Sequence, residues 1–282
     1  SEVGRKAEMR AVFELLPMGR EREHQPQETR RFENAVDEIQ AIGRCVLLGE
    51  PGGGKTTTVW KLAADLVERA LTDRAAPIPL LVRLGKWTDA DQSLPDFIAS
   101  QLGDLGAYLD MLLSEKRAAL LLDGLNELPA SQQRAKYPKV KRFVEANTGL
   151  LVVVSCRELD YTIDLGFDKI NITPLDPIRI REFVGRYLGE AKGDDLFWKL
   201  AGESAANWHR RFMDEIGDKL EQPERIFWIA AQLPAGVRWD WGSSDEAYHN
   251  TYWRDWLKER EKPSGLMILA RNPYMLLMLT SV

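Results

Sequence analysis

The sequence has 282 residues, of which 44% are hydrophobic and 29% are charged, a composition typical of one large or two ordinary folded domains. Its formal net charge of −5 at pH 7 argues against a protein that binds nucleic acid over its whole surface. No run approaches the roughly 18 apolar residues of a membrane-spanning helix, and the polar N-terminus lacks the apolar centre of a secretory signal. Cys45 and Cys156 lie in apolar runs without metal-ligand spacing to any histidine, which predicts buried, reduced thiols in a cytoplasmic protein.

The first 42 residues are expected to form a helical lead-in. Residues 4–16 and 28–41 each show the spacing of apolar side chains that is typical of a short amphipathic helix. The second of these segments leads directly into the first strand, and its apolar face consists of Phe32, Ala35, Val36 and Ile39.

A phosphate-binding motif follows that first strand. Arg44–Leu48 has the branched, apolar character of a buried strand, and Gly49–Thr56 after it reads G-x-x-x-x-G-K-[ST]. In this motif backbone N–H groups surround the β-phosphate of a nucleotide, the lysine reaches the β- and γ-phosphate oxygens, and the hydroxyl residue can ligate Mg²⁺. Apolar residues then recur at helical spacing, so strand, loop and helix follow one another in the required order. The residues predicted to bind a nucleoside triphosphate are Glu50, Pro51, Gly52, Gly53, Gly54, Lys55, Thr56 and Thr57.

Four further apolar runs predict strands, at residues 78–84, 118–123, 150–155 and 169–172, with helices between them. Several of these runs are uninterrupted, which is typical of strands that are buried on both faces. Five strands alternating with helices predict an α/β fold with a parallel sheet covered on both sides, over residues 43–174.

Charged residues follow two of these strands. Asp123 ends an apolar run, so its carboxylate is expected at the carboxyl edge of the sheet, where it can hold Mg²⁺ together with Thr56. Glu127 lies four residues later and is predicted to polarise an attacking water; the alternative for this pair is a plain acidic turn. Arg157 follows the fourth strand, where a guanidinium can contact the γ-phosphate, the alternative being a solvated or salt-bridged arginine.

From about residue 175 to residue 282 the pattern predicts only helices, and therefore a second, all-helical domain. Asp176 and Pro177 are typical of the first residues of a helix, which we expect to end at Gly189. The last predicted helix begins at Pro273 and is apolar on every side, so another part of the protein has to cover it. We therefore expect the chain to be a fragment, truncated at its C-terminus, of a longer protein with effector and sensor domains.

A tryptophan-rich stretch covers residues 191–264 of this helical domain. Two interpretations are open: an accessory core built from large apolar rings, or a recognition surface, since tryptophan is enriched at interface hot spots. Burial of the rings distinguishes the two. The tryptophans concerned are Trp198, Trp208, Trp228, Trp239, Trp241, Trp253 and Trp256.

Four motifs of this chain together resemble those of NACHT-family NTPases, which belong to the STAND branch of P-loop ATPases and are related to AAA+ proteins. The resemblance spans roughly residues 44–282, and the displaced acidic pair of the second motif is its most specific element. The motifs are Gly49–Thr57, Leu120–Leu128, Val154–Arg157 and Asn272–Leu277.

The resemblance implies a sheet in the strand order 5-1-4-3-2, followed by a helical domain whose conserved-motif proline, Pro273 in this chain, packs against the nucleotide. Many members of the family have aspartate where this chain has Asn126, so Glu127 is left as the main candidate for the catalytic base. The full set of predicted catalytic residues is Glu127, Lys55, Arg157 and Asn126.

By the same resemblance, the expected function is that of a slowly hydrolysing ATPase that acts as a molecular switch. An ADP-bound form would be closed and monomeric, and an ATP-bound form would self-associate through the nucleotide-binding module, in innate immunity or anti-phage defence. No [NT]-K-x-D guanine signature is present, which favours ATP and ADP, with Mg²⁺, and residues 25–33 are expected to close over the base. The alternatives are a small-molecule kinase and an AAA+-like remodelling ATPase.

Overall fold

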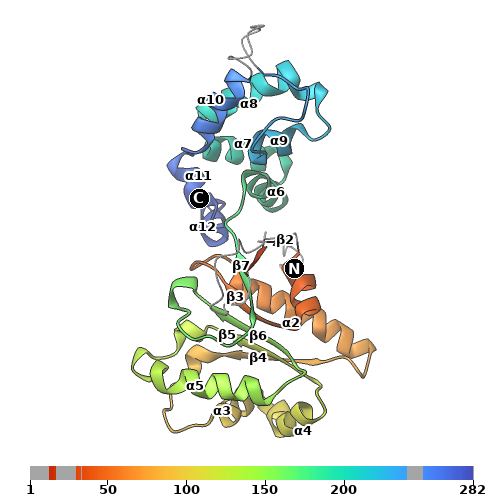
Figure 1. Cartoon of the computed structure of the whole chain (residues 1–282), viewed down its shortest axis with the longest axis vertical. Helices are drawn as coiled ribbons and strands as arrows, with labels where there is room; N and C mark the ends of the chain where they lie inside the picture. The colour runs from red at the N-terminus through yellow and green to blue at the C-terminus, as the bar shows by residue number, and fades with distance from the viewer. Residues whose placement is uncertain (1–12, 17–29, 33, 240–249, 282) are drawn as a thin grey trace, which may run out of the picture. The chain divides into compact units, whose positions relative to one another are not determined.

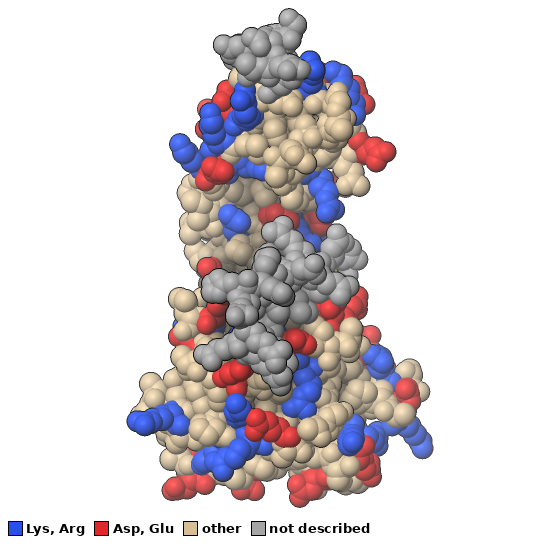
Figure 2. Space-filling view, viewed as in Figure 1, with Lys and Arg blue, Asp and Glu red and all other residues tan. Residues whose placement is uncertain are grey.

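The computed structural model describes residues 13–16, 30–32, 34–239 and 250–281 (Figure 1). These residues fall into two compact units, one within Arg10–Thr173 and one within Pro174–Val282, which we call the sheet unit and the helical unit. None of the helices described is both long enough and apolar enough to cross a bilayer. Acidic and basic side chains are interspersed on the face that Figure 2 shows, in keeping with the net acidic charge of the chain.

The sheet unit contains a seven-stranded sheet in the order β2-β1-β7-β3-β6-β5-β4. When its five parallel strands, β3 to β7, are numbered 1 to 5 along the chain, they lie side by side in the order 5-1-4-3-2 that the family resemblance implies. The predicted fold class is therefore confirmed. The strands are β1 (Phe13–Leu16), β2 (Arg30–Phe32), β3 (Arg44–Leu48), β4 (Ile78–Arg83), β5 (Ala118–Asp123), β6 (Leu151–Cys156) and β7 (Asp168–Ile172).

Both faces of the sheet are apolar because successive residues of a strand point to opposite sides. In β5, Leu120 and Leu122 join the core under helices α3, α4 and α5, whereas Leu121 joins the core under α1 and α2. Figure 1 shows these helices in two layers, with the sheet between them. The helices are α1 (Ala35–Ile42), α2 (Lys55–Thr72), α3 (Leu94–Gln101), α4 (Leu109–Ser114) and α5 (Ala130–Ala146).

The N-terminal region differs from the helical lead-in that the sequence predicts. Residues 13–16 and 30–32 are strands rather than parts of the expected helices 4–16 and 28–41, and β1 pairs antiparallel with both β2 and β7. Pairing of β1 along the edge of β7 satisfies backbone groups that a helix would leave unpaired at that edge. These hydrogen bonds between distant segments outweigh the local preference for a helix that the spacing of apolar residues indicates. Residues 4–12 and 28–29 lie outside the described residues. The later part of the second helix is confirmed as α1, which begins after Asn34.

The described part of the helical unit contains helices and no strand, as predicted. The Asp176 side chain accepts a hydrogen bond from the backbone N–H of Arg179 at 2.9 Å and so caps α6, which ends before Gly189. The helices are α6 (Pro177–Leu188), α7 (Glu190–Ala201), α8 (Glu203–Ile216), α9 (Pro223–Ile229), α10 (Thr251–Arg260), α11 (Gly265–Ala270) and α12 (Pro273–Leu279).

The tryptophans that the structure describes in the helical unit belong to its core, which confirms the accessory-core interpretation for these residues. Trp256 is 1% exposed, stacks on Phe227 with ring centroids 4.1 Å apart, and donates its indole N–H to the Phe227 carbonyl at 2.9 Å. Trp228, Trp239 and Trp253 are also buried. Trp198 and Trp208 are partly buried against the same core, and Trp241 lies outside the described residues.

Helix α12 is apolar on every side but is covered on one side only among the described residues. Pro273 and Leu276 are buried, whereas three other apolar side chains of the helix and three of α11 are exposed. The exposed side chains are Leu266, Ile268, Leu269, Tyr274, Leu277 and Met278.

Trp256→Ala is expected to destabilise the helical unit by about 3–5 kcal/mol, because it removes a fully buried ring and leaves a cavity. Urea unfolding of the whole chain, followed by far-ultraviolet circular dichroism, measures the shift of the transition midpoint. Trp60→Ala is the control, since this ring is 46% exposed on α2 and its loss is expected to cost less than about 1 kcal/mol. Equal destabilisation by the two variants would contradict the assignment of Trp256 to the core.

Candidate nucleotide-binding site

The phosphate loop occupies residues 49–54, between the end of β3 and the first residue of α2. Gly54 adopts a left-handed conformation with φ of 98°, which residues with a Cβ atom rarely adopt, and it directs the chain into the helix. The Gly53 N–H donates to the Glu50 carbonyl at 3.0 Å and closes the turn of the loop. Gly54, the residue before α2, has no side chain with which to cap the first turn of the helix. The N–H groups at this helix start are therefore arranged as an anion-binding site.

Lys55, the first residue of α2, places its ammonium over the loop. Its Nζ donates to the carbonyls of Gly49 and Glu50, at 2.8 Å each. Burial lowers the pKa of this ammonium below its ordinary value, and the positive charge of Arg157 lowers it further. The charges of Asp123 and Glu127 act in the opposite direction. The predicted lysine, arginine and carboxylates lie at or just after the carboxyl ends of the parallel strands β3, β5 and β6, and therefore at one edge of the sheet.

A chain of hydrogen bonds links the phosphate loop to β5 and β6. The Thr56 hydroxyl donates to the Asp123 carboxylate, 3.0 Å from Oδ2, and the Ser155 hydroxyl donates to Oδ1 at 2.5 Å. Ser155 in turn accepts a hydrogen bond from the Gly124 N–H at 2.8 Å. Asp123 and Ser155 are 6% and 1% exposed. Buried polar groups of this kind are stable because each has a partner.

Ser155 is a site residue that the sequence analysis missed. The signal was a single hydroxyl side chain that follows three valines in the otherwise apolar segment 151–156. Leu122 pairs with Val154 in parallel register. The next residue of each strand, Asp123 in β5 and Ser155 in β6, therefore lies beside the other. That neighbour relation requires the strand order, which the spacing of residues alone does not contain.

The Thr56 hydroxyl and the Asp123 carboxylate fit a Mg²⁺ ion that binds together with a nucleotide. Both are hard oxygen donors, and Mg²⁺ in nucleotide sites is held by one or two protein oxygens, substrate phosphates and water. Among the described residues, no group of three or more His, Cys, Asp or Glu side chains could hold a metal ion on its own. A site that needs phosphate oxygens for completion agrees with both observations.

Glu127 ends the short 3₁₀ helix η4 (Leu125–Glu127), and its side chain is exposed at the same edge of the sheet. Two glycines make room for it. A Cβ atom at Gly124 would lie 2.8 Å from Glu127 Oε2, and one at Gly85 would lie 3.1 Å from the same oxygen. Gly124 also has φ of 81°, so a side chain there would be strained as well as obstructive. The carboxylate is accessible to water, as a residue that activates water has to be.

Asn126 and Arg157 are in contact, but through the backbone of the arginine. The Asn126 side-chain oxygen accepts a hydrogen bond from the Arg157 backbone N–H at 3.0 Å, while the Arg157 side chain is exposed. The structure thus assigns Asn126 a contact that orders the loop. A catalytic role for either side chain stays a prediction.

Two predicted contacts with the nucleotide involve other residues: that of Pro273 and that of the base-covering segment 25–33. Pro273 is the first residue of α12 in the helical unit, where the Asn272 side chain caps the helix, and its packing on a nucleotide stays a prediction. Within the expected base-covering segment 25–33, only residues 30–32 are described, and they form strand β2.

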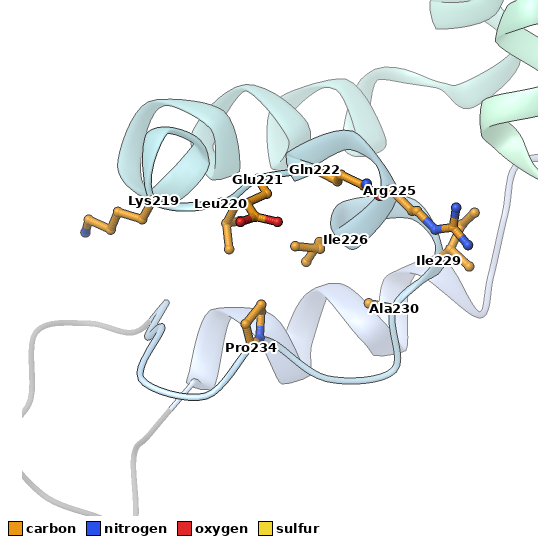
Figure 3. A pocket seen from close by; sticks show the side chains of 9 residues that line it. All are labelled: Lys219, Leu220, Glu221, Gln222, Arg225, Ile226, Ile229, Ala230 and Pro234. Carbon is orange, nitrogen blue, oxygen red and sulfur yellow. The ribbon is translucent and has the colours of Figure 1, made fainter.

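A separate pocket of about 540 Å³ lies entirely within the helical unit (Figure 3). It is open and is formed by the segment before α9, by α9 itself and by the loop that follows. None of the predicted nucleotide-binding residues lines it. Its lining residues are Lys219, Leu220, Glu221, Gln222, Arg225, Ile226, Ile229, Ala230 and Pro234.

Comparison with known proteins agrees with this geometry. The family model of the NACHT domain matches residues 43–187, just over half of the 282 residues, and the match includes β3 to β7 and most of α6. A search among curated proteins found no match. The matched segment contains the phosphate loop, the Thr56–Asp123–Ser155 hydrogen bonds and Glu127. The chain therefore belongs to the NACHT family of P-loop NTPases.

Proposed function

We propose that this chain is the ATP-binding and slowly hydrolysing switch module of a larger signalling protein. The observation that carries the proposal is the chain of hydrogen bonds from Thr56 at the phosphate loop, through Asp123, to Ser155, with Lys55 and Glu127 at the same sheet edge. A phosphate loop alone needs only Lys55 and the backbone. The added Asp123 carboxylate and a water-accessible glutamate, Glu127, support hydrolysis.

Each residue of the site has one part in the proposed mechanism. The backbone N–H groups at the start of α2 and the Lys55 ammonium bind the phosphates, and the Arg157 guanidinium contacts the γ-phosphate. The Glu127 carboxylate orients the attacking water and accepts its proton. Thr56 and Asp123 hold Mg²⁺, which when bound neutralises charge on the β- and γ-phosphate oxygens.

The switch follows from the difference between the two nucleotides. A γ-phosphate adds contacts with Lys55 and Arg157 that ADP cannot make, so ATP and ADP favour different conformations in proportion to that difference in binding free energy. We propose that the ATP-bound form self-associates through the nucleotide-binding module and that the ADP-bound form is monomeric. The family resemblance supports a cytoplasmic role in immune or anti-phage signalling, with effector and sensor domains in other parts of the protein.

Lys55→Ala is expected to abolish ATP binding, because it removes the only lysine of the phosphate-binding motif at residues 49–56. Loss of one partner of a desolvated, hydrogen-bonded charge pair costs about 2–5 kcal/mol, which corresponds to at least roughly a 30-fold loss of affinity. Isothermal titration calorimetry with ATP and Mg²⁺ measures the effect. The control is Lys61→Ala, which removes the same charge from the same helix, where Lys61 pairs with Asp65 at 2.8 Å. Unchanged affinity in Lys55→Ala would refute the site.

Glu127→Gln is expected to retain ATP binding but to slow hydrolysis about 10²–10⁴-fold, because an amide cannot accept the proton of the attacking water. Phosphate release under single-turnover conditions measures the rate. Glu115→Gln is the control, since Glu115 follows α4 and precedes β5, at the opposite edge of the sheet. Unimpaired hydrolysis in Glu127→Gln would remove Glu127 from its role. A phosphorylated metabolite as product would favour a small-molecule kinase, and DNA-stimulated turnover would favour a remodelling ATPase.

A further inference from the structure

Side-chain hydrogen bonds at two places connect the end of β6 to the end of β5 and to the segment that follows β5. The Ser155 hydroxyl of β6 binds Asp123 and Gly124, and the Asn126 side-chain oxygen binds the Arg157 backbone N–H after β6. Only the first of these reaches a residue proposed to hold Mg²⁺. The pair therefore separates two effects: general attachment of the segment, which both places share, and orientation of Asp123, which only Ser155 provides.

The Ser155 hydroxyl donates its only hydrogen within this network and accepts a hydrogen bond there as well. Its single hydrogen is donated to Asp123 Oδ1, and it accepts the Gly124 N–H in return. Rotation of the hydroxyl would leave a buried carboxylate oxygen and a buried N–H unpaired, which is costly in a site with this little exposure to water. The hydroxyl is therefore fixed in direction.

A fixed Ser155 hydroxyl determines which way the Asp123 carboxylate faces. One carboxylate oxygen is held by Ser155, so the other, Oδ2, is the one closer to Thr56. Without Ser155 the carboxylate could rotate about its Cβ–Cγ bond and lose its alignment with the Thr56 hydroxyl. Partners that orient a metal-binding side chain in this way commonly affect metal affinity as much as activity.

We propose that Ser155 is a positioning residue that orients Asp123 for Mg²⁺ binding beside Thr56. This inference rests on the proposed function, since it requires that the site binds Mg²⁺ with ATP. Its distinguishing consequence is that Ser155 affects the gain in ATP affinity that Mg²⁺ produces, and leaves the affinity for metal-free ATP unchanged. The phosphate loop, which binds metal-free ATP, makes no hydrogen bond with Ser155 among the described residues.

The test is calorimetric titration of ATP into the full chain, once with Mg²⁺ and once with a chelator. Ser155→Ala is expected to reduce the ratio of the two affinities roughly 10- to 100-fold. Asn126→Ala is the matched control, because it removes the hydrogen bond with the Arg157 N–H and leaves both bonds to Asp123 in place. Its affinity ratio is expected to equal that of the wild type. The test compares binding affinities and not hydrolysis rates, so the predicted catalytic role of Asn126 does not enter the comparison.

A second pair of variants guards against a loss of folding in Ser155→Ala. Ser155→Thr keeps the hydroxyl, and Ser155→Val introduces a side chain of nearly the same shape as threonine but without the hydroxyl. Of these two variants, only the valine variant is expected to lose Mg²⁺ dependence. A wild-type affinity ratio in Ser155→Val, or an equal loss in Asn126→Ala, would overturn the proposal. If the wild type itself binds ATP without any Mg²⁺ dependence, the proposed function fails instead, and the two failures are thus distinguishable.

Discussion

The hydrogen bond between the Thr56 hydroxyl and the Asp123 carboxylate joins the phosphate loop to the end of β5, and the remainder of the site is arranged around it. The two residues belong to strand–loop segments that are not neighbours in the sheet, because β6 lies between β3 and β5. The strand that separates them supplies Ser155 to the same carboxylate. The site is thus made from the ends of three adjacent strands, and it exists only in this strand order.

The same three strands carry the polar residues of the site at or just after their carboxyl ends. Their other side chains alternate between the two helix-covered cores, whereas the phosphate loop, Asp123 and Ser155 form the site. Asp123 is buried as a result, and a buried carboxylate is costly unless hydrogen bonds compensate for the lost water. The two hydroxyls provide that compensation, so one pair of side chains both stabilises the fold and shapes the site.

Local pattern was sufficient to predict the elements whose residues carry their own signal. The phosphate loop, the buried strands and Asp123 each combine a distinctive composition with a fixed place along the chain. Strands β1 and β2 could not be predicted in this way, because their conformation depends on the distant edge of β7. Ser155 was missed for the same reason, since its partner is 32 residues away in the chain. For Asn126 the sequence indicated a place in the site but not its hydrogen bond to the Arg157 backbone.

The aromatic core of the helical unit also has a spectroscopic consequence. Seven of the nine tryptophans belong to this unit, and neighbouring indole rings in its core lie within energy-transfer distance, with centroids 5.5–6.5 Å apart. Light absorbed by one indole can therefore migrate through the cluster before emission. The remaining two, Trp60 and Trp87, belong to the sheet unit, so replacing them with phenylalanine would leave an intrinsic fluorophore that reports on the helical unit alone.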